Sequence, residues 1–538
     1  MLSFEFKFPS FFTRCSQGNT LVKVAKWEYT GICEFSEKFR YFIFINFYKG
    51  PLHMEKEKTF LGQPRGLSTL FFTEMWERFS YYGMRAILVY FMYDAVANGG
   101  LGLPKGTAVA IMSIYGSLVY MSSIVGGWIS DRLLGSNKSV FYGGILIMLG
   151  HIVLATPLGI PALFVSMMLI VIGTGLLKSN VSGMVGHLYS KDDIRRDAGF
   201  SIFYMGINIG GLLAPIIVGI LGQEVNYHLG FSIAAIGMFI GLVQYYVQGK
   251  TTLKSVAIAP TNPLSAAEKK TFFRAVVLVL LALAVLFGAA ATGHLTVDFF
   301  INFISVLGIF LPIYYFTKML RSKDVTPDEK KKVLAYIPLF LSAIVFWSLE
   351  EQGSSILALF AADRTQSTLF GINIPASLYQ TLNPLFVVLL TPVFVWLWTK
   401  LGSRQPRTEV KFAIGLVLAG LSFLLLMLPS LLFGVEERVS PLWLVLSFFI
   451  MIAGEMCLSP VGLSVTTKLA PKAFEAQTLA IWLLADASSQ AINAQIARFY
   501  TPQTEGMYYG IVGGVAVVVG IILYLARKPI RNLIGNIH

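Results

Sequence analysis

The sequence of 538 residues is poor in charged residues and in cysteine. Asp, Glu, Lys and Arg make up only 13% of it, whereas hydrophobic residues make up 55%. Soluble domains rarely have such a composition. Its three cysteines, Cys15, Cys33 and Cys457, have no CxxC or other metal-ligand spacing, so they imply neither disulfides nor a zinc site. The sequence therefore predicts a membrane protein without a disulfide or metal framework.

Motifs for ATP hydrolysis and for hydrolytic catalysis are also missing. Gly249-Lys250-Thr251 resembles the end of a P-loop, but Gln244 stands where the first glycine belongs. Neither HExxH nor GxSxG occurs, and no nucleophile lies beside a base, as an acyltransferase or an intramembrane hydrolase would require. We expect a secondary carrier, neither an enzyme nor an ATP-driven pump, and no metal or organic cofactor.

Long hydrophobic runs, in contrast, recur from residue 67 onward. In lipid, helices satisfy every backbone hydrogen bond internally, so each apolar window of about 20 residues is expected to be helical. The predicted fold class is an all-α membrane protein with about fourteen transmembrane helices. The predicted spans are 67–95, 106–130, 138–157, 161–187, 198–221, 226–248, 271–292, 297–318, 333–361, 376–399, 412–432, 441–467, 475–499 and 506–526.

The basic residues alternate between successive loops. The formal net charge is +13, and Lys and Arg cluster in every second loop. This positive-inside pattern, with an even number of spans, predicts that both termini are cytoplasmic. Nucleic acid is not an expected partner, because no soluble domain carries a basic face with interleaved aromatics. The loops are short, which favours a bacterial cytoplasmic membrane. The alternate loops hold only Lys105, Arg364, Arg438 and Arg498.

The spans group as six, two and six along the chain. This grouping predicts an N-terminal six-helix bundle over 54–248, a linker with two extra transmembrane helices over 249–331, and a C-terminal six-helix bundle over 332–538. Residues 1–53 mix aromatics and lysines and lack the pattern of a secretory signal. We interpret them as an extension that is disordered or results from a non-native start, and an interfacial anchor at 36–48 is the alternative.

The first span carries an unusual stripe of charges. Glu74, Glu77, Arg78, Tyr81 and Arg85 follow one another at helical spacing, so they share one face. A charge within a membrane costs roughly 2.5 to 3.5 kcal/mol on insertion scales and therefore faces a protein interior or a water-filled cavity. The stripe predicts a polar cavity through which ions or polar solutes move.

The loop after the second span has a recognisable glycine and charge pattern. Residues 127–135 read Gly-Trp-Ile-Ser-Asp-Arg-Leu-Leu-Gly, which resembles the GxxxDRxxG loop of the major facilitator superfamily. In that pattern Asp131 and Arg132 pair across the cytoplasmic face as a latch, while the glycines permit close helix approach. An ordinary charged loop cap is the alternative.

Three longer motifs identify a family. The first is Glu74-x-x-Glu77-Arg78-Phe79-x-x-Tyr82-Gly83, the second runs from Asp197 to Gly211, and the third is Phe346-Trp347-x-x-Glu350-Glu351-Gln352-Gly353. With them the chain resembles the proton-dependent oligopeptide transporter (POT/PTR) family of the major facilitator superfamily. The resemblance covers about residues 55–530 and implies two six-helix bundles plus two inserted helices. It also implies a bacterial symporter of protons with di- and tripeptides that works by alternating access.

Charged residues from both halves suit a zwitterionic peptide in the cavity. Arg78 and Lys178 offer cations for its carboxylate, and Arg85 can add a third. Glu350, Glu351 and Glu455 can accept its ammonium group. The resemblance links the position of Glu455 to amine binding and to pairing with Lys178 at an inner gate. It also implies an outer gate between Lys105 and Asp363, for which two solvated loop charges are the alternative.

Other expected binding residues are polar amides and aromatics. Asn208 and Asn383 can hydrogen-bond the peptide backbone, and loose aromatic pockets predict broad side-chain tolerance. Tyr120 and Trp482 can instead simply pack between helices. Asp486 lies where related bacterial carriers often have a small hydroxyl residue; it can favour basic peptides, titrate, or pair with a nearby cation. The expected pocket aromatics are Tyr81, Tyr82, Tyr120, Trp347 and Trp482.

Proton coupling is expected where carboxylates share a cation. When a substrate carboxylate draws Arg78 away, the carboxylate left behind is expected to take up a proton. Expected partners are di- and tripeptides, protons and the lipid bilayer, with the chain as a monomer. A carrier of nitrate or another small solute and a non-transporting peptide sensor are the alternatives. The expected coupling residues are Glu77 and Glu74 first, then Glu351 and Glu350, then Glu455, with Arg78 and Lys178 as their cations.

Overall fold

A computed structural model describes the chain over residues 59–190, 193, 195–254, 256, 259–260, 262–292, 294, 296–369 and 371–534. The interpretations of residues 1–53 lie outside these residues. Up to the linker, the helices are α2 (Arg65–Tyr93), α3 (Lys105–Ile129), α4 (Ser136–Leu154), α5 (Ile160–His187), α6 (Arg196–Ala214), α7 (Ile220–Glu224) and α8 (Tyr227–Thr252). The linker contributes α9 (Ala266–Ala291) and α10 (Val297–Arg321).

The second half of the chain is likewise helical, apart from one small hairpin. Its helices are α11 (Pro327–Glu350), α12 (Ile356–Asp363), α13 (Leu382–Leu401), α14 (Thr408–Phe433), α15 (Leu442–Leu469), α16 (Glu475–Ile496), α17 (Glu505–Leu525) and α18 (Arg527–Ile534). Strands β1 (Thr368–Leu369) and β2 (Ile372–Asn373) pair antiparallel, with Thr368 opposite Asn373. Short 3-10 turns are η1 (Val96–Asn98), η4 (Glu351–Ser354), η5 (Ala376–Thr381), η6 (Gly402–Arg404), η7 (Lys472–Phe474), η8 (Ala497–Phe499) and η9 (Pro502–Thr504), and the π-helical turns are η2 (Ser130–Leu134) and η3 (Pro215–Gly219).

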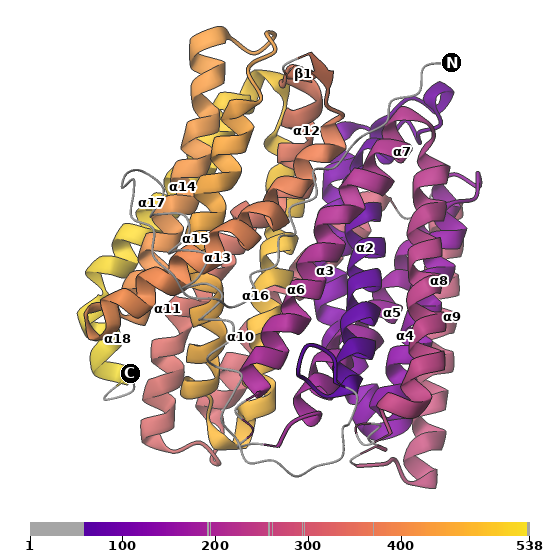
Figure 1. The fold of residues 1–538 in the computed structure, drawn as a ribbon, viewed down its shortest axis with the longest axis vertical. Coiled ribbons are helices and arrows are strands. Elements are labelled where there is room, and N and C mark those ends of the chain that lie inside the picture. The colour runs from indigo at the N-terminus through magenta and orange to yellow at the C-terminus, as the bar shows by residue number, and fades with distance from the viewer. Residues whose placement is uncertain are drawn as a thin grey trace, which may run out of the picture. The chain divides into compact units, whose positions relative to one another are not determined.

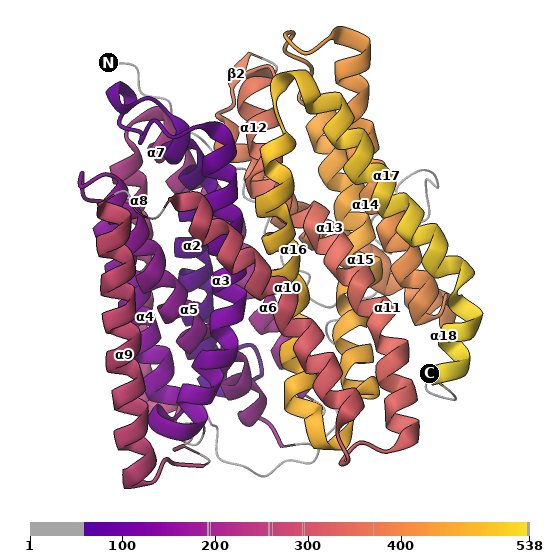
Figure 2. The ribbon, with the colours of Figure 1, turned by 180° about the vertical axis from the view of Figure 1, so that it is seen from behind.

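The predicted membrane fold is confirmed. Within the described residues, eleven helices are long and apolar enough to cross a membrane. Helices α2, α9 and α16 lie at three further predicted spans. Figures 1 and 2 show the first half of the chain packed as one bundle of helices and the second half as another, with α10 seen from behind between them.

Local sequence signals set several helix ends. Thr326 and Glu329 form a reciprocal capping box at the start of α11, with Pro327 at its first turn. Asn226 caps α8 by accepting a hydrogen bond from the backbone N–H of His228 at 2.7 Å. Pro215 has no N–H to donate, and the helix changes there from α6 to the π-helical turn η3.

The predicted seventh span, 333–361, is not one continuous helix. Helix α11 ends at Glu350, the 3-10 turn η4 follows, and Ser355 leaves helical geometry at φ −128° and ψ −86° before α12 begins. Three polar side chains in the turn hold partners outside the helix, as described below. Hydrophobic periodicity does not report such a break, because the apolar pattern resumes on the far side.

Glycines allow the closest helix crossings within each bundle. A Cβ atom on Gly143 of α4 would lie 2.6 Å from the carbonyl oxygen of Gly173 on α5, and the reverse contact is equally tight. Gly420 of α14 and Gly513 of α17 repeat this arrangement in the second bundle, at 2.6 and 2.7 Å. Backbones in contact gain dispersion energy that lipid tails alone do not supply, which explains the glycine pattern.

The two inserted helices behave differently. Helix α10 packs on α3 of the first bundle and on α16 of the second, where Ser488 donates to the carbonyl of Gly308 at 2.8 Å. Helix α9 contacts the turn η2 through Glu268 and Arg132, 2.9 Å apart, and the end of α3 through Phe272 against Trp128. Much of the remaining apolar surface of α9 is exposed.

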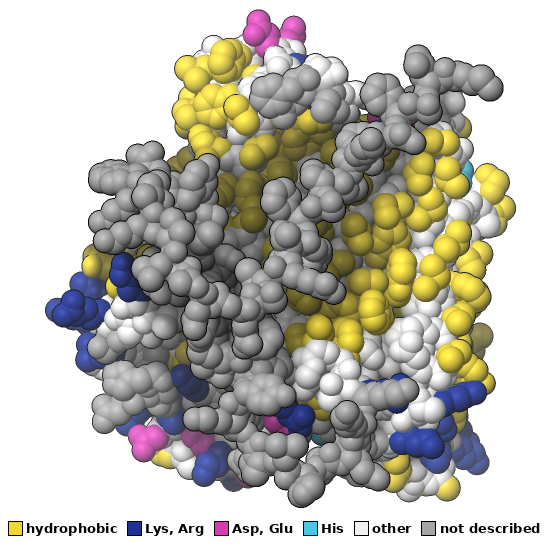
Figure 3. Space-filling view, in the orientation of Figure 1, with side chains coloured by type: hydrophobic (Ala, Val, Ile, Leu, Met, Phe, Trp, Pro, Cys, Tyr) yellow, Lys and Arg dark blue, Asp and Glu magenta, His cyan; other side chains and the backbone are white. Residues whose placement is uncertain are grey.

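The chain crosses back and forth, so its loops fall at two ends. The basic end carries Arg132, Lys138, Arg404 and Lys472, and the opposite end, here called the gate end, carries Lys105. In Figure 3 dark blue Lys and Arg side chains gather toward the lower part of the visible face, and an apolar surface lies above them. Sequence and structure therefore agree on the charge asymmetry that a membrane protein shows between its two sides.

Candidate functional site

The centre of the site is one guanidinium between two carboxylates on α2. Arg78 Nε lies 3.1 Å from Glu74 Oε1 and 2.5 Å from Glu77 Oε2. All three side chains are buried, and Glu77 is 0% exposed. Helical spacing puts them on one face, as the sequence predicted. The cluster holds one cation and two acids, so Arg78 alone cannot balance the charge of both carboxylates when both are ionised.

Lys178 on α5 supplies further positive charge nearby. It interacts electrostatically with Glu74, Glu77 and Asp486. Its ammonium also lies 4.3 Å from the centre of the Tyr120 ring, a cation–π distance. The expected pairing of Lys178 with Glu455 is not among the contacts that the structure gives for the described residues. It stays a prediction for another conformation.

A second cluster joins the two bundles. Arg85 of α2 contacts Glu351 at 2.8 Å, and the same nitrogen donates to Ser354 Oγ at 2.5 Å. Tyr120 of α3 donates to the other oxygen of Glu351 at 3.3 Å, and Gln490 of α16 donates to the oxygen that Arg85 binds. Glu351 therefore collects donors from three helices, and Arg85, expected as a third cation for substrate, is already paired.

The remaining carboxylates of the second bundle lie close to one another. Glu350 accepts a hydrogen bond from Asn383 Nδ2 at 2.6 Å. It also interacts electrostatically with Glu455, which is 8% exposed, and with Asp486. Asn208 on α6 donates to the carbonyl of Tyr204 in its own helix at 2.9 Å. Among these acids, Asp486 also interacts with Lys178 of the first half of the chain.

Aromatic residues border these charges. The Tyr81 ring lies 5.2 Å from the guanidinium carbon of Arg78 and 5.5 Å from that of Arg85. Tyr82 is 36% exposed, and Trp347 is partly buried. Trp482 packs directly on the bare backbone of Gly462 in α15, which is the packing role considered from sequence. The extra carboxylate, Asp486, is buried, and its Oδ1 has no hydrogen-bond partner among the described residues.

At the gate end, Lys105 and Asp363 form the expected contact between the bundles. Lys105 Nζ lies 2.6 Å from Asp363 Oδ2, with the side chains 46% and 38% exposed. Nearby, Tyr90 donates to the carbonyl of Ala358 at 3.0 Å. These contacts hold the first bundle against α12. Whether they gate transport stays a prediction.

The basic residue beside this gate, Arg364, is not the loop charge that the sequence suggested. Its Nε contacts Glu505 Oε1 at 3.0 Å, and both side chains are almost completely buried. Its other nitrogens donate to the carbonyls of Gly434, at 2.6 Å, and Glu437. Arg364 thereby ties the end of α12 to α17 and to the loop after α14. Sequence could not show this, because Glu505 lies 141 residues away.

The loop motif at the basic end contacts the linker. Arg132 binds Glu268 as described above, and the backbone carbonyls of Asp131 and Arg132 accept from Asn262, at 3.1 Å, and Leu264, at 3.0 Å. The expected pairing of Asp131 with Arg132 is not among the contacts given for the described residues, so the latch stays a prediction. The linker supplies the partners instead, because its chain runs directly past the loop.

A buried amide network behind Glu351 was missed from sequence. Asn493 accepts from Ser348 at 2.6 Å and from Gln352 at 3.3 Å, and Tyr508 donates to Gln352 at 2.7 Å. This network fixes η4 against α16 and α17. Helical spacing on α16 was an available signal, because Gln490 and Asn493 follow Asp486 by four and seven residues.

The comparisons with known proteins agree with this arrangement. The sequence profile described as the POT family matches residues 137–512. The chain belongs to the POT family. This family consists of transporters, so the enzyme alternative receives no support from it. A di-/tripeptide transporter of Lactococcus lactis subsp. cremoris is 55% identical to the chain over 490 residues, 90% of this chain and 99% of the relative.

Further POT family relatives extend the comparison. The peptide transporter YePEPT of Yersinia enterocolitica is 36% identical over 501 residues, 89% of this chain and 97% of the relative. A crystal structure of the peptide transporter POT in complex with sulfate superposes with a TM-score of 0.86 at 55% identity, over 88% of this chain and 97% of that chain. A POT family transporter in complex with 5-aminolevulinic acid gives 0.85 at 46% identity, over 88% and 98%. The fold of 88% of this chain is therefore similar to that of each of these two structures.

The buried pair at the gate end predicts an unequal response to charge removal. Arg364→Met leaves Glu505 buried without its cation, which costs about 3 to 5 kcal/mol. Lys331→Met removes an exposed partner of Asp328, and such pairs are typically worth about 0 to 1 kcal/mol. Melting temperatures of both variants in the same detergent should therefore fall clearly for the first and hardly for the second. Equal shifts in melting temperature would show that the buried Arg364–Glu505 pair stabilises the protein no more than the exposed Lys331–Asp328 pair.

Proposed function

We propose that this chain is a proton-coupled symporter that imports di- and tripeptides by alternating access. The observation that carries the proposal is the shared guanidinium of Arg78, held by Glu74 and Glu77 in a buried site. Lys178, which interacts with both of these acids, also interacts with Asp486 of the second bundle. The relatives that are peptide transporters support the choice of substrate.

The ligand that matches the site has a positive and a negative end. Arg78 binds a carboxylate bidentately once it leaves its acids, and Lys178 adds a point charge from α5. Glu350 and Glu455 offer oxygen acceptors for an ammonium group across the cavity. A peptide of two or three residues carries both ends with a polar backbone between them, where Asn383 can hydrogen-bond.

Charge balance links peptide binding to proton uptake. When the peptide carboxylate takes Arg78, either Glu74 or Glu77 is left buried without a cation, and an isolated buried carboxylate is costly. Protonation removes that cost, so peptide and proton bind cooperatively. One proton crossing about 100 mV and one pH unit supplies about 3.7 kcal/mol, enough for roughly 500-fold accumulation of a neutral peptide.

Two ion pairs between the bundles are expected to break and re-form in each transport cycle. Opening the gate end requires the contacts of Lys105 with Asp363 and of Arg85 with Glu351 to separate. We place the basic end in the cytoplasm because of the positive-inside pattern, with both termini there and the gate end outside. In this proposal the chain acts as a monomer in the cell membrane without a cofactor, and the proton is its coupling ion.

The first test is uptake of labelled dialanine into liposomes that contain the purified protein. With an inward proton gradient and a negative interior, the wild type should accumulate dialanine, and a protonophore should abolish the accumulation. Glu77→Gln and Arg78→Ala should abolish it as well, because the acid–cation exchange is lost. Asp328→Asn, at a highly exposed surface position, should behave as the wild type.

Several results would contradict this assignment. Gradient-driven accumulation that survives Glu77→Gln or Arg78→Ala refutes the coupling role of the Arg78 cluster. An inserted, folded wild type that accumulates no peptide points to nitrate, another small solute or a sensing role. Competition by unlabelled di- and tripeptides, but not by nitrate, is expected if the substrate is a short peptide.

The gate pair predicts a small, reversible effect. An exposed ion pair is worth about 0.2 to 1 kcal/mol. Loss of the attraction in Lys105→Asp should therefore change the dialanine uptake rate by no more than about fivefold, and repulsion between the two aspartates adds to this change. The double reversal Lys105→Asp with Asp363→Lys should restore most of the rate. A single reversal without any effect, or a double reversal no better than the single ones, removes the pair from the gating mechanism.

Asp486 predicts a preference among peptides. Its buried, unpartnered oxygen near Lys178 offers an acceptor for a basic side chain. Asp486→Ser should therefore weaken competition by lysylalanine against labelled dialanine uptake, while competition by unlabelled dialanine changes little. An unchanged ratio between the two competitors would show that Asp486 does not select side chains.

A further inference from the structure

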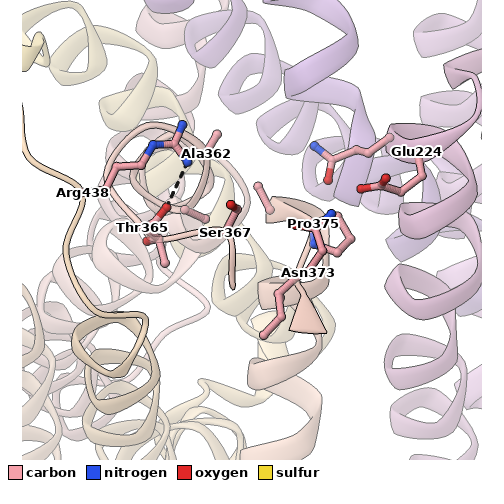
Figure 4. A pocket seen from close by; sticks show the side chains of 11 residues that line it. Glu224, Ala362, Thr365, Ser367, Asn373, Pro375 and Arg438 are labelled. Carbon is pink, nitrogen blue, oxygen red and sulfur yellow. Dashed lines mark hydrogen bonds between the residues drawn. The ribbon is translucent and has the colours of Figure 1, made fainter. Parts of the chain in front are cut away.

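A polar cavity lies at the gate end, and none of the Arg78 cluster residues lines it. Its volume is about 250 Å³. Figure 4 shows Arg438 and Thr365 on one side and Glu224 on the other, with Ser367 and Asn373 between them. Ligand sites for drug-sized molecules usually occupy about 300 to 1,000 Å³, so this cavity suits a smaller molecule.

The two charged residues of this cavity are exposed and make few contacts with described residues. Glu224 has no hydrogen bond or ion pair with any described residue, and Arg438 makes a single hydrogen bond to the carbonyl of Thr365, at 3.2 Å. One wall therefore offers a carboxylate for an ammonium group, and the other offers a guanidinium for a carboxylate. Hydroxyl and amide groups lie between these ends, where a peptide backbone needs partners.

Backbone hydrogen bonds hold the cavity wall in place. Residues 364–366 pair with Val439, whose N–H donates to Arg364 O at 2.7 Å and whose carbonyl accepts from Gln366 N at 3.0 Å. These bonds fix the position of Arg438. The hairpin β1–β2 is extended by a bond from Ile374 N to Ser367 O at 2.7 Å. Preformed walls reduce the ordering cost of binding a small ligand.

The cavity is lined by residues of both bundles, so it depends on their contact at the gate end. Glu224 ends α7 in the first bundle, and the other charged wall belongs to the second bundle. The two meet where Gln223 Oε1 accepts from the backbone N–H of Ser377 at 2.7 Å. Gly219 lies so close to Ser377 that an added Cβ would be 2.8 Å from its Oγ. Separation of the bundles at this end would pull the two walls apart.

We infer that this cavity binds a short zwitterionic peptide from outside, with its ammonium toward Glu224 and its carboxylate toward Arg438, and that the bound peptide holds the gate closed. The inference rests on the proposed function for the identity of the ligand and the side it comes from. A ligand that binds only one conformation shifts the equilibrium toward it. At ten times its dissociation constant it multiplies the weight of the closed state about 11-fold.

The inference predicts that external peptide at high concentration inhibits its own uptake. Initial rates of labelled dialanine uptake would be measured in proteoliposomes over a wide range of external dialanine. The wild type should pass through a maximum and then fall severalfold, whereas Glu224→Gln with Arg438→Gln should rise to a plateau. Glu436→Gln, an exposed acid near Arg438 that does not line the cavity, should follow the wild type.

A second measurement reads the cavity without transport. Hydrogen–deuterium exchange of the purified protein, with and without dialanine, should show protection of residues 220–226 and 371–378 in the wild type and in Glu436→Gln. The double variant should lose that protection and keep any protection of α2. Protection without uptake would refute symport but support the cavity. Uptake without protection at these segments, or inhibition that persists in the double variant, would overturn the inference.

Discussion

A charge placed inside a membrane protein needs a partner, and this constraint accounts for most of the polar architecture. Arg78 is shared by Glu74 and Glu77, Arg85 is bound by Glu351, and Arg364 is bound by Glu505. Two of the pairs join different elements, Arg85 of α2 to η4 and the end of α12 to α17, whereas the Arg78 cluster lies on α2 alone. Removing one member leaves the other as a buried charge without a partner, which costs free energy of folding. The pairs are therefore structural connections, and they are also places where binding of an ion or a zwitterion can rearrange the structure.

These pairs differ in what they connect, and that difference separates their roles. The Arg78 cluster lies within a single helix, so its rearrangement changes charge without moving the bundles. The Arg85–Glu351 pair crosses between bundles and continues through Gln490 to α16. The Arg364–Glu505 pair stays inside the second bundle and keeps α12 in one position relative to α17. We therefore propose proton exchange for the Arg78 cluster and coupling between the bundles for Arg85–Glu351, whereas Arg364–Glu505 supports the second bundle.

Much of this arrangement could be predicted from the sequence. The spans followed from hydrophobic length, the charged face of α2 followed from helical spacing, and the contact of Lys105 with Asp363 followed from family resemblance. These features depend on local pattern or on motifs that many chains share. The expected side of each gate and the role of each carboxylate remain predictions.

The features that could not be predicted depend on distant partners. The burial of Arg364 requires Glu505, the partner of Arg132 is Glu268 in the linker, and the break after Glu350 requires donors from α2, α3 and α16. From sequence alone, a polar residue beside an apolar run is assigned to a loop or a helix cap, because its tertiary partner is unknown. The gate-end cavity was even less predictable, because its walls come from segments that lie far apart in the sequence and share no local pattern.

The contact between α3 and α16 sets the mechanical scale of any opening. Ser117, midway along α3, donates to the carbonyl of Ala487 at 2.8 Å, and small side chains on both helices keep the axes close there. A helix of 25 residues is about 38 Å long, so each arm beyond this contact is about 19 Å. Rotation by about 10° about such a fulcrum moves an end by about 3 Å. That displacement is comparable with the 2.6 Å separation of Lys105 and Asp363. A modest tilt of α3 is therefore enough to separate this ion pair while the middle of α3 stays packed against α16.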